Sequence, residues 1–385
     1  MKKILVLLLA VIMVFAFAAC SANDSSTTPP ADDGSSATAT PAAADESGEP
    51  LTVGFLYIGT INDGGYTQAQ HDGTEALQKA LGDKVNCIWK EEVDDTTAQA
   101  SQDAAKQLID QGATVIIGTS FGFGAPLFEM ANSGNYDNIK FMHFSGADIN
   151  DTNFGNYFGA MEQPSYLAGV IAGMQTKSNK IGYVAPFNYT EVLIGINAMA
   201  LGAQSVNPDA TMSVVYINSW YDPAKEKSAA ETLLKQGCDV IAQGSDTTGP
   251  QLAAANEGKL CIGYNLDNSA IEGLENAYLT APIWHHEVFL VPTIQKIIDG
   301  TWKPESYYGT MADGYISLSP LTKNVTDESK AKVAEIEAKF KAGDPVFVGP
   351  IEDNEGNVVV KEGESLDRAG IWKMEYLVKG VTATK

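Results

Sequence analysis

The chain has 385 residues, of which 48 are acidic and 25 are basic, so its net charge at pH 7 is -23. A surface of this sign repels polyanions, which argues against a nucleic acid as a partner. Roughly 335 residues follow the polar, low-complexity start of the chain, enough for one large domain or two of ordinary size.

The first 20 residues have the pattern of a lipoprotein signal. Lys2 and Lys3 precede an apolar run over 4–17, and small residues lead to Cys20. The apolar run is too short to cross roughly 30 Å of hydrocarbon comfortably, and polar residues follow it. We therefore predict a signal peptide over 1–19 and lipidation of the Cys20 thiol, with palmitate as an acyl chain, on the extracytoplasmic face of the cell membrane. An ordinary secretory peptide or an anchoring helix is the alternative.

The segment 20–50 begins with this cysteine and continues with Ser, Thr, Ala, Pro, Asp and Gly and almost no large apolar residue. Such a composition cannot bury enough apolar surface to fold. We predict a disordered tether that lets a folded body move above the membrane.

From Leu51 onward, apolar runs of strand length alternate with amphipathic stretches of helix length. The runs that we expect to be strands are 53–57, 115–118, 181–184, 214–217 and 240–242. Strands that alternate with helices are typical of an α/β fold with mostly parallel sheets.

An internal repeat divides this part of the chain. Residues 104–120 and 229–245 both consist of a helical stretch, a glycine, a buried strand and a polar strand end. Upstream, the strand at 53–56 has a counterpart at 181–184 at nearly the same offset. Any two βαβ units look alike, but two segments in the same order and spacing favour two similar lobes.

We predict that lobe 1 comprises 51–159 plus 281–308 and that lobe 2 comprises 160–280 plus 309–385. Ligands of open α/β sheets bind beyond the carboxyl ends of the strands, so two facing lobes would form a cleft from such loops. These loops are 59–67, 119–124, 187–190, 218–222, 244–249 and 264–269. Closure needs hinges where the chain crosses between lobes, which we place near Gly159, Ala281 and Gly309.

Two aromatic residues stand in loops of opposing lobes. Tyr66 opens the helix after the first strand, and Trp220 lies in a strand-end loop before Asp222 and Pro223. Together they can stack on both faces of a flat ring, although Trp220 can instead pack in the core. Asp222 followed by Pro223 predicts an N-cap with proline in the first helical turn.

Three aspartates, Asp63, Asp246 and Asp267, lie in the same set of loops. A buried carboxylate that accepts hydrogen bonds from ring N–H groups would orient a nitrogen heterocycle. Each aspartate can instead cap the helix that follows it. The glycines near Asp63 lack the spacing of a phosphate-binding loop.

The sequence contains no motif for covalent or metal-dependent catalysis. His285 and His286 are adjacent, which is not the H-E-x-x-H spacing of a zinc helix, and there is no G-x-S-x-G elbow. Cys87, Cys238 and Cys261 show no C-x-x-C spacing and are expected to be buried and unpaired. We expect no metal site and no cofactor. A secreted metal-dependent hydrolase built on the two histidines is the alternative.

Several stretches match one known family. The most specific is 219–226, Ser-Trp-Tyr-Asp-Pro-Ala-Lys-Glu, and the others are 53–55, 62–67, 71–73, 243–246, 263–267 and 299–302. In these stretches the chain resembles the basic membrane protein (BMP) family of ABC-transporter substrate-binding lipoproteins, the PnrA-like group. The resemblance extends over essentially all residues from Leu51 onward.

The resemblance implies a type I periplasmic-binding-protein fold, no enzymatic activity, and a purine nucleobase or nucleoside that is delivered to an ABC permease. Carried over by position, Tyr66 and Trp220 stack on the ligand, and polar contacts come from Asp63, Ser120, Asp246 and Asp267. We add Phe121 and Trp284 as expected ligand contacts.

One departure from the family pattern concerns the sugar. Nucleoside-binding relatives carry a lysine near the position of Trp284, and its replacement favours a free base such as adenine. A lipoprotein that senses a small molecule and presents it to a membrane receptor fits the same sequence.

Overall fold

The structure is a computed structural model that describes residues 49–384. The predicted signal peptide, Cys20 and nearly all of the predicted tether lie outside the described residues. Within the described residues, no helix has the length and apolar character needed to cross a membrane.

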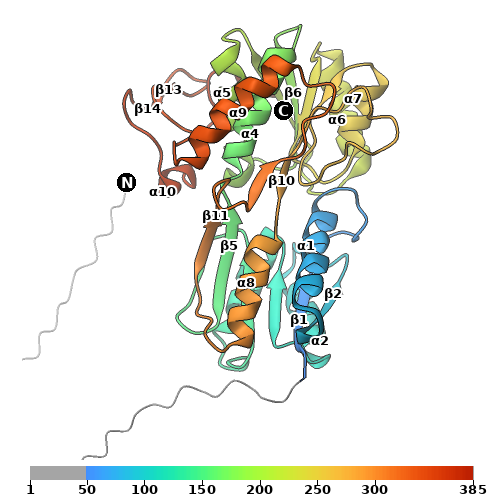
Figure 1. Cartoon of the computed structure of the whole chain (residues 1–385), viewed down its shortest axis with the longest axis vertical. Helices are drawn as coiled ribbons and strands as arrows, with labels where there is room; N and C mark the ends of the chain where they lie inside the picture. The colour runs from blue at the N-terminus through green and yellow to red at the C-terminus, as the bar shows by residue number, and fades with distance from the viewer. Residues whose placement is uncertain (1–48, 385) are drawn as a thin grey trace, which may run out of the picture. The chain divides into compact units, whose positions relative to one another are not determined.

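One half of the described chain is built on a six-stranded parallel sheet with the strand order β11-β5-β4-β3-β1-β2. We call this sheet and its helices lobe 1 (Figure 1). Its strands are β1 (Leu51–Leu56), β2 (Val85–Lys90), β3 (Val115–Gly118), β4 (Lys140–Phe144), β5 (Phe154–Gly159) and β11 (Ser306–Gly309). Its helices are α1 (Tyr66–Leu81), α2 (Ala98–Asp110), α3 (Gly124–Ala131) and α8 (Glu287–Ile298), with short 3₁₀ turns at Gly82–Lys84 and Phe121–Phe123.

The other half, lobe 2, is built on a five-stranded parallel sheet with the order β15-β7-β6-β8-β9. Its strands are β6 (Lys180–Ala185), β7 (Thr211–Tyr216), β8 (Val240–Gln243), β9 (Leu260–Cys261) and β15 (Val381–Thr384). Its helices are α4 (Glu162–Gln175), α5 (Thr190–Val206), α6 (Pro223–Lys235), α7 (Gly249–Asn256) and α9 (Asp327–Lys341).

The remaining elements connect or extend the lobes. Strands β10 (Pro282–Trp284) and β12 (Ile316–Leu318) pair antiparallel where the chain crosses between the sheets. After α9, strands β13 (Ile351–Glu352) and β14 (Val358–Val360) form a hairpin, and helix α10 (Arg368–Ile371) follows. The predicted lobe boundaries and hinge residues remain predictions, although Gly159 and Gly309 are paired at the ends of β5 and β11.

The repeat that the sequence predicts is present in the backbone. Gly112 follows α2 with φ of 96°, and Gly237 follows α6 with φ of 89°, a conformation that glycine adopts without steric cost. The next residue, Ala113 or Cys238, donates its N–H to the carbonyl of Leu108 or Leu233 and leads into a fully buried strand. The α/β fold with parallel sheets flanked by helices is thereby confirmed.

Close helix packing completes lobe 2. Helices α4 and α5 are buried on nearly all sides, as their many apolar residues require. A Cβ atom at Gly169 of α4 would lie 2.0 Å from the carbonyl oxygen of Met199 in α5. The small residues of these helices therefore let their backbones touch and form a compact support for the strand-end loops.

Candidate functional site

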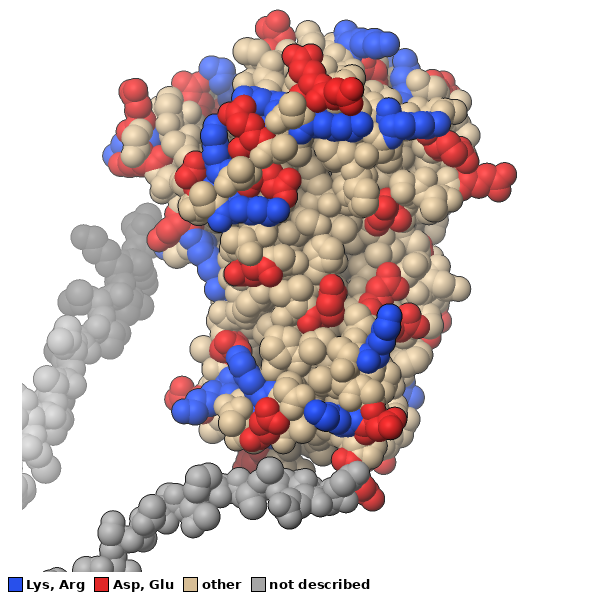
Figure 2. Space-filling view, in the orientation of Figure 1, with Lys and Arg blue, Asp and Glu red and all other residues tan. Residues whose placement is uncertain are grey.

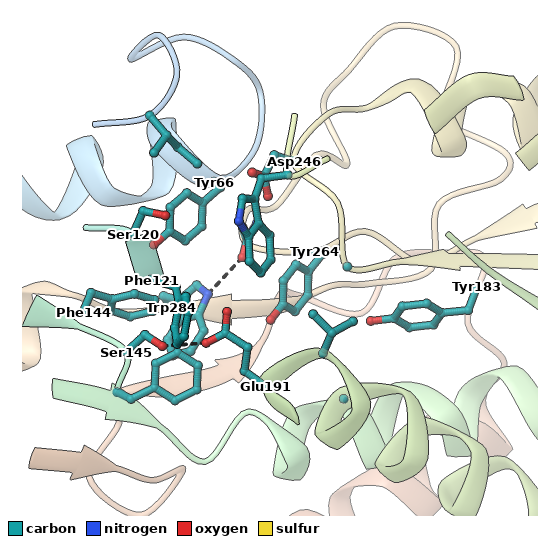
Figure 3. Close-up of a pocket in the computed structure, with 17 residues that line it drawn as sticks. Tyr66, Ser120, Phe121, Phe144, Ser145, Tyr183, Glu191, Asp246, Tyr264 and Trp284 are labelled. Carbon is teal, nitrogen blue, oxygen red and sulfur yellow. Dashed lines mark hydrogen bonds between the residues drawn. The ribbon is translucent and has the colours of Figure 1, made fainter. Parts of the chain in front are cut away.

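A cavity lies between the lobes and encloses about 610 Å³ of empty space, counting the solvent at its mouth. Volumes of roughly 300–1,000 Å³ are typical of small-molecule sites. Aromatic and polar side chains surround it (Figure 3). The lining residues are Ile58, Tyr66, Ser120, Phe121, Phe144, Ser145, Phe158, Tyr183, Glu191, Val192, Gly195, Trp220, Gly244, Asp246, Tyr264, Asn265 and Trp284.

Lobe 1 contributes a mainly aromatic wall. Tyr66 begins α1, and its hydroxyl donates to the carbonyl of Thr119 at the end of β3. The ring of Phe144, at the end of β4, lies 6.0 Å from the ring of Tyr66 and 5.0 Å from that of Trp284. Phe158, at the end of β5, packs 4.9 Å from Phe144. These contacts fix the rings in place and leave their exposed faces and edges toward the cavity.

Asp246, in the loop after β8, is the most distinctive polar group of the site. Asp246 is only 3% exposed, and its carboxyl receives no hydrogen bond from residues 49–384. Burial raises the pKa of Asp246 well above its usual range, and the carboxyls of Glu226 and Asp63 add to this effect. Because Asp246 lines the cavity, its carboxyl is placed to bind a group that enters it.

Glu226 holds the loop that presents Asp246. It is fully buried, and its carboxyl accepts from the N–H and hydroxyl of Thr247 at 3.0 and 2.7 Å. Its other oxygen accepts from the N–H of Asp222 at 3.1 Å, while Asp222 caps α6 through the N–H of Lys225. The predicted N-cap at Asp222 with Pro223 in the first turn is confirmed. Thus the Trp220 loop and the Asp246 loop are tied together by one buried carboxyl.

A second carboxyl of the wall, Glu191, links the two lobes. Glu191 lies in the first turn of α5 in lobe 2, and it accepts a 2.6 Å hydrogen bond from the hydroxyl of Ser145 in lobe 1 (Figure 3). Burial raises the pKa of Glu191 to about 7. Ser145 has φ of 84°, a conformation that is uncommon outside glycine and is often found at functional sites.

Other contacts between the lobes bring their loops together. The amide of Asn268 in lobe 2 donates to the carbonyl of Gly64 in lobe 1 at 3.2 Å. A Cβ atom at Gly65 would lie 1.8 Å from the carbonyl oxygen of Asp246, so only glycine allows this approach. The structure therefore represents an arrangement in which the lobes are in contact around the cavity.

Trp284 and Asn265 close the floor of the cavity. The indole N–H of Trp284 donates to the side-chain oxygen of Asn265 at 3.0 Å. The amide nitrogen of Asn265 is buried and has no acceptor among the described residues. Asn265 can therefore donate a hydrogen bond to a bound molecule.

Six of the eight residues predicted to contact ligand line the cavity. They are Tyr66, Ser120, Phe121, Trp220, Asp246 and Trp284. The hydroxyl of Ser120 already donates to Asp95 at 2.6 Å, and Phe121 is 53% exposed at the mouth. Their contact with a ligand remains a prediction.

Asp63 and Asp267 are not among the lining residues. The Asp63 carboxyl accepts from the N–H groups of Gly65, Thr67 and Gln68 at 2.8, 2.9 and 3.1 Å, which makes it the cap of α1. Asp267 is exposed and accepts from the N–H of Ser269 at 3.0 Å in a tight turn. The helix-capping alternative is thereby confirmed for Asp63, whereas Asp267 bonds a turn and caps no helix, since the next helix begins at Glu287.

Sequence reasoning missed several lining residues. Phe144 ends strand β4 and Ser145 follows it, and this strand was not predicted. Glu191 has the sequence pattern of an ordinary acidic residue in the first turn of a helix. Tyr264 and Asn265 line the cavity and lie in the predicted cleft loop 264–269. Their position soon after a strand is the signal that could have identified them.

The two adjacent histidines do not form a metal site. His285 bonds the hydroxyl of Ser317 at 2.8 Å, whereas His286 is buried and bonds the hydroxyl of Tyr315 at 3.2 Å. Among residues 49–384, no cluster of His, Cys, Asp and Glu is arranged to hold a metal ion. Cys87, Cys238 and Cys261 are unpaired there.

Comparison with known proteins finds one family and several binding proteins. Residues 51–344 match the family described as "ABC transporter substrate-binding protein PnrA-like". The chain is 34% identical over 334 residues to a protein of Brucella abortus named purine-binding protein, which covers 86% of this chain and 93% of that protein. It is 36% identical over 301 residues to a Haloferax volcanii protein named putative ABC transporter glucose-binding protein, with 78% and 75% of the two chains covered.

A solved structure supports the fold. An ABC transporter solute-binding protein from Aeropyrum pernix K1 superposes with a TM-score of 0.66 at 18% identity and covers 78% of this chain and 94% of that chain. At this identity the likeness concerns the fold alone.

Proposed function

This chain belongs to the PnrA-like family of ABC transporter substrate-binding proteins, and on that basis we propose that its ligand is a purine nucleobase or nucleoside. The family makes it a binding protein outside the cytoplasm that serves an ABC importer, not an enzyme. Capture would follow closure of the lobes on the ligand, and delivery would follow contact with the permease.

The observation that carries the proposal is the buried, unpartnered carboxyl of Asp246 in an aromatic cavity. Because burial raises the pKa of Asp246, the carboxyl can hold its proton and then both donate and accept a hydrogen bond. Purine rings present a donor beside an acceptor on one edge, as in the amino group and ring nitrogen of adenine. Such an edge matches a neutral carboxyl, while the ring faces suit Tyr66 and Trp220.

The charge of the cavity wall narrows the range of possible ligands further. Within the described part of the chain, Glu191 and Asp246 are acidic and no Lys, Arg or His lines the cavity. Phosphate groups would meet two carboxyls and no cation, so nucleotides are expected to bind poorly. Figure 2 also shows acidic and basic side chains interspersed on one face of the molecule, without a basic patch.

Trp284 favours a free base over a nucleoside. The family resemblance seen in the sequence implies a lysine near this position in nucleoside-binding relatives, whereas this chain has Trp284, whose indole N–H is already bonded to Asn265. The position therefore offers an apolar ring to the ligand and no cation for sugar hydroxyls.

A hexose is the second candidate, because the Haloferax volcanii relative is named as a glucose-binding protein. Aromatic faces and carboxyls also suit the apolar and hydroxyl-bearing sides of a sugar. Isothermal titration calorimetry with adenine, guanine, adenosine, guanosine, inosine and glucose separates the two. We expect one purine to bind with 1:1 stoichiometry. Binding of glucose alone, or of none of the purines, would overturn the purine assignment.

We also propose that Cys20 anchors the protein to the membrane through a lipid. The support is the signal-like pattern of the first 20 residues and the extracytoplasmic role of the family. Detergent phase partition of the full chain expressed in a bacterium should place the wild type in the detergent phase and Cys20→Ser in the aqueous phase. Equal partition of both would contradict the anchor.

A further inference from the structure

The residues after the family match form a structured segment. We call 345–384 the C-terminal segment; it begins where the match to the PnrA-like family ends, at residue 344. Several of its apolar side chains are fully buried, including Phe347, Met374 and Val381 at 0% exposure. The C-terminal segment is therefore part of the folded protein, and it contacts both lobes.

The C-terminal segment is fastened to lobe 2. Its final strand, β15, pairs with β7 and extends the sheet of lobe 2 at that edge. Asn197 of α5 is fully buried, donates to the carbonyl of Tyr376 at 2.7 Å and accepts from the N–H of Val378 at 2.9 Å. These bonds hold the backbone that immediately follows α10.

Helix α10 and the residue after it contact lobe 1 instead. The Arg368 guanidinium donates to the hydroxyl of Ser306 at 3.1 Å and lies 4.5 Å from the ring centroid of Tyr308, both in β11. The Trp372 ring packs edge-on, 5.3 Å from the ring of Phe158 in β5. Figure 1 shows α10 near the level at which the two lobes meet.

These contacts lie directly behind the ligand cavity. Phe158 lines the cavity and packs on Phe144 and Trp284, so Trp372 is one ring removed from the site. Strands β5 and β11 end at Gly159 and Gly309, which are paired where the chain leaves lobe 1. Tyr308 also donates to the buried carboxyl of Glu162, the first residue of α4 in lobe 2.

We propose that the C-terminal segment is a bracket across the hinge, in which Trp372 and Arg368 are positioning residues for the ligand wall. A segment anchored on lobe 2 and packed against β5 and β11 resists rotation of one lobe against the other, because rotation would separate these contacts. Trp372 also holds Phe158 in the conformation that borders the cavity. The bracket thus sets ligand affinity without touching the ligand, whatever that ligand is.

The test compares Trp372→Ala, Trp372→Phe and Arg368→Ala with Lys373→Ala, an exposed neighbour in the same segment. For the purine that the wild type binds, we expect Trp372→Ala to weaken affinity roughly 3- to 30-fold, mainly through faster dissociation. Arg368→Ala should have a smaller effect, Trp372→Phe should restore most of the affinity, and Lys373→Ala should behave as wild type. A loss that Trp372→Phe does not restore, or that Lys373→Ala shares, would overturn the positioning role.

Hydrogen exchange of the ligand-free protein keeps this test independent of the purine proposal. We expect faster amide exchange in 154–159 and 306–309 in Trp372→Ala and Arg368→Ala, while the core strand β3 stays protected. Wild-type exchange in both segments of both variants would overturn the bracket even if purines bind. If the wild type binds no purine but exchange rises as expected, the bracket stands and the purine assignment fails.

Discussion

Strand β3 of lobe 1 and strand β8 of lobe 2 occupy corresponding places in the internal repeat, yet the loops after them present different groups to the cavity. After β3, the Ser120 hydroxyl donates to Asp95 at 2.6 Å and the Thr119 hydroxyl donates to the carbonyl of Leu56 at 2.6 Å. After β8, Asp246 projects a carboxyl that no group among the described residues satisfies. The framework is repeated, and the chemistry of the strand ends is not.

The same difference extends over the whole cavity wall. Both carboxyls that line the cavity, Glu191 and Asp246, come from lobe 2. Lobe 1 contributes mostly phenylalanine rings and the ring of Tyr66, whose hydroxyl is bonded within lobe 1. We infer that lobe 2 selects the ligand and that lobe 1 covers it. Corresponding substitutions in the two lobes should therefore have unequal effects.

The largest effect is expected for Asp246→Ala, which should weaken purine binding about 10- to 100-fold because it removes the free carboxyl. Asp246→Asn should retain most of the affinity, since an amide also places a donor beside an acceptor. Asp95→Ala is the matched control in lobe 1, where the carboxyl bonds Ser120 and does not line the cavity. Calorimetry that finds equal losses for Asp246→Ala and Asp95→Ala would remove the contrast between the lobes.

Trp220→Ala should have the next largest effect, about 10-fold or somewhat more, because stacking of a base on an aromatic ring contributes about 1–3 kcal/mol. Trp220→Phe should recover part of the loss. Trp89→Ala is the control, since Trp89 is 37% exposed on β2 and does not line the cavity. If Trp220→Ala binds a purine as tightly as wild type, the ring does not stack on the ligand.

Glu191 should give a smaller, pH-dependent effect. In the closed arrangement the pKa of Glu191 is raised to about 7, mainly by burial, whereas an open cleft would expose it and return the pKa toward 4.5. Closure is therefore favoured at low pH, and this contribution is lost as pH rises from about 5 through 7. We expect affinity to fall several-fold over that range in the wild type.

Glu191→Gln should reduce that pH dependence, because the amide does not ionise and can still accept from Ser145, while the buried carboxyl of Asp246 continues to contribute. Calorimetric titrations at pH 5, 6, 7 and 8 measure the slope for both proteins. Glu328→Gln, an exposed substitution on α9, should keep the wild-type slope. Equal slopes for wild type and Glu191→Gln would show that Glu191 does not couple closure to pH.

The smallest effect is expected for Ser120→Ala, at most about threefold. Its hydroxyl donates to Asp95, so only its acceptor capacity is available to a ligand. A loss as large as that of Asp246→Ala would mean that lobe 1 also selects the ligand, contrary to the asymmetry that we infer.

The sequence predicted the fold well because local patterns determine it. The strand at 115–118 has the predicted bounds, and the glycines after α2 and α6 mark both copies of the repeat. Placing strand-end loops at a common cleft follows from the topology of parallel sheets. Six predicted residues consequently line the cavity.

The remaining parts of the site depend on long-range contacts. Asp267 and Asp246 both lie in strand-end loops, so the sequence does not distinguish them. In the structure, Asp267 is exposed and its carboxyl accepts from the backbone N–H of Ser269, whereas Asp246 is buried. Glu191 lines the cavity beside Ser145 of the other lobe, whose hydroxyl donates to it at 2.6 Å, and no local sequence pattern predicts this contact. The C-terminal segment has no counterpart in the repeat, so nothing in its pattern indicated that Trp372 would pack behind Phe158.

The most direct test of the account is a crystal structure with the purine that binds most tightly. We predict the ring between Tyr66 and Trp220, with a ring or amino nitrogen about 2.7–3.2 Å from a carboxyl oxygen of Asp246. A purine bound in this cavity with no hydrogen bond to Asp246, or bound outside the cavity, would contradict the central claim that this free carboxyl of lobe 2 selects the ligand.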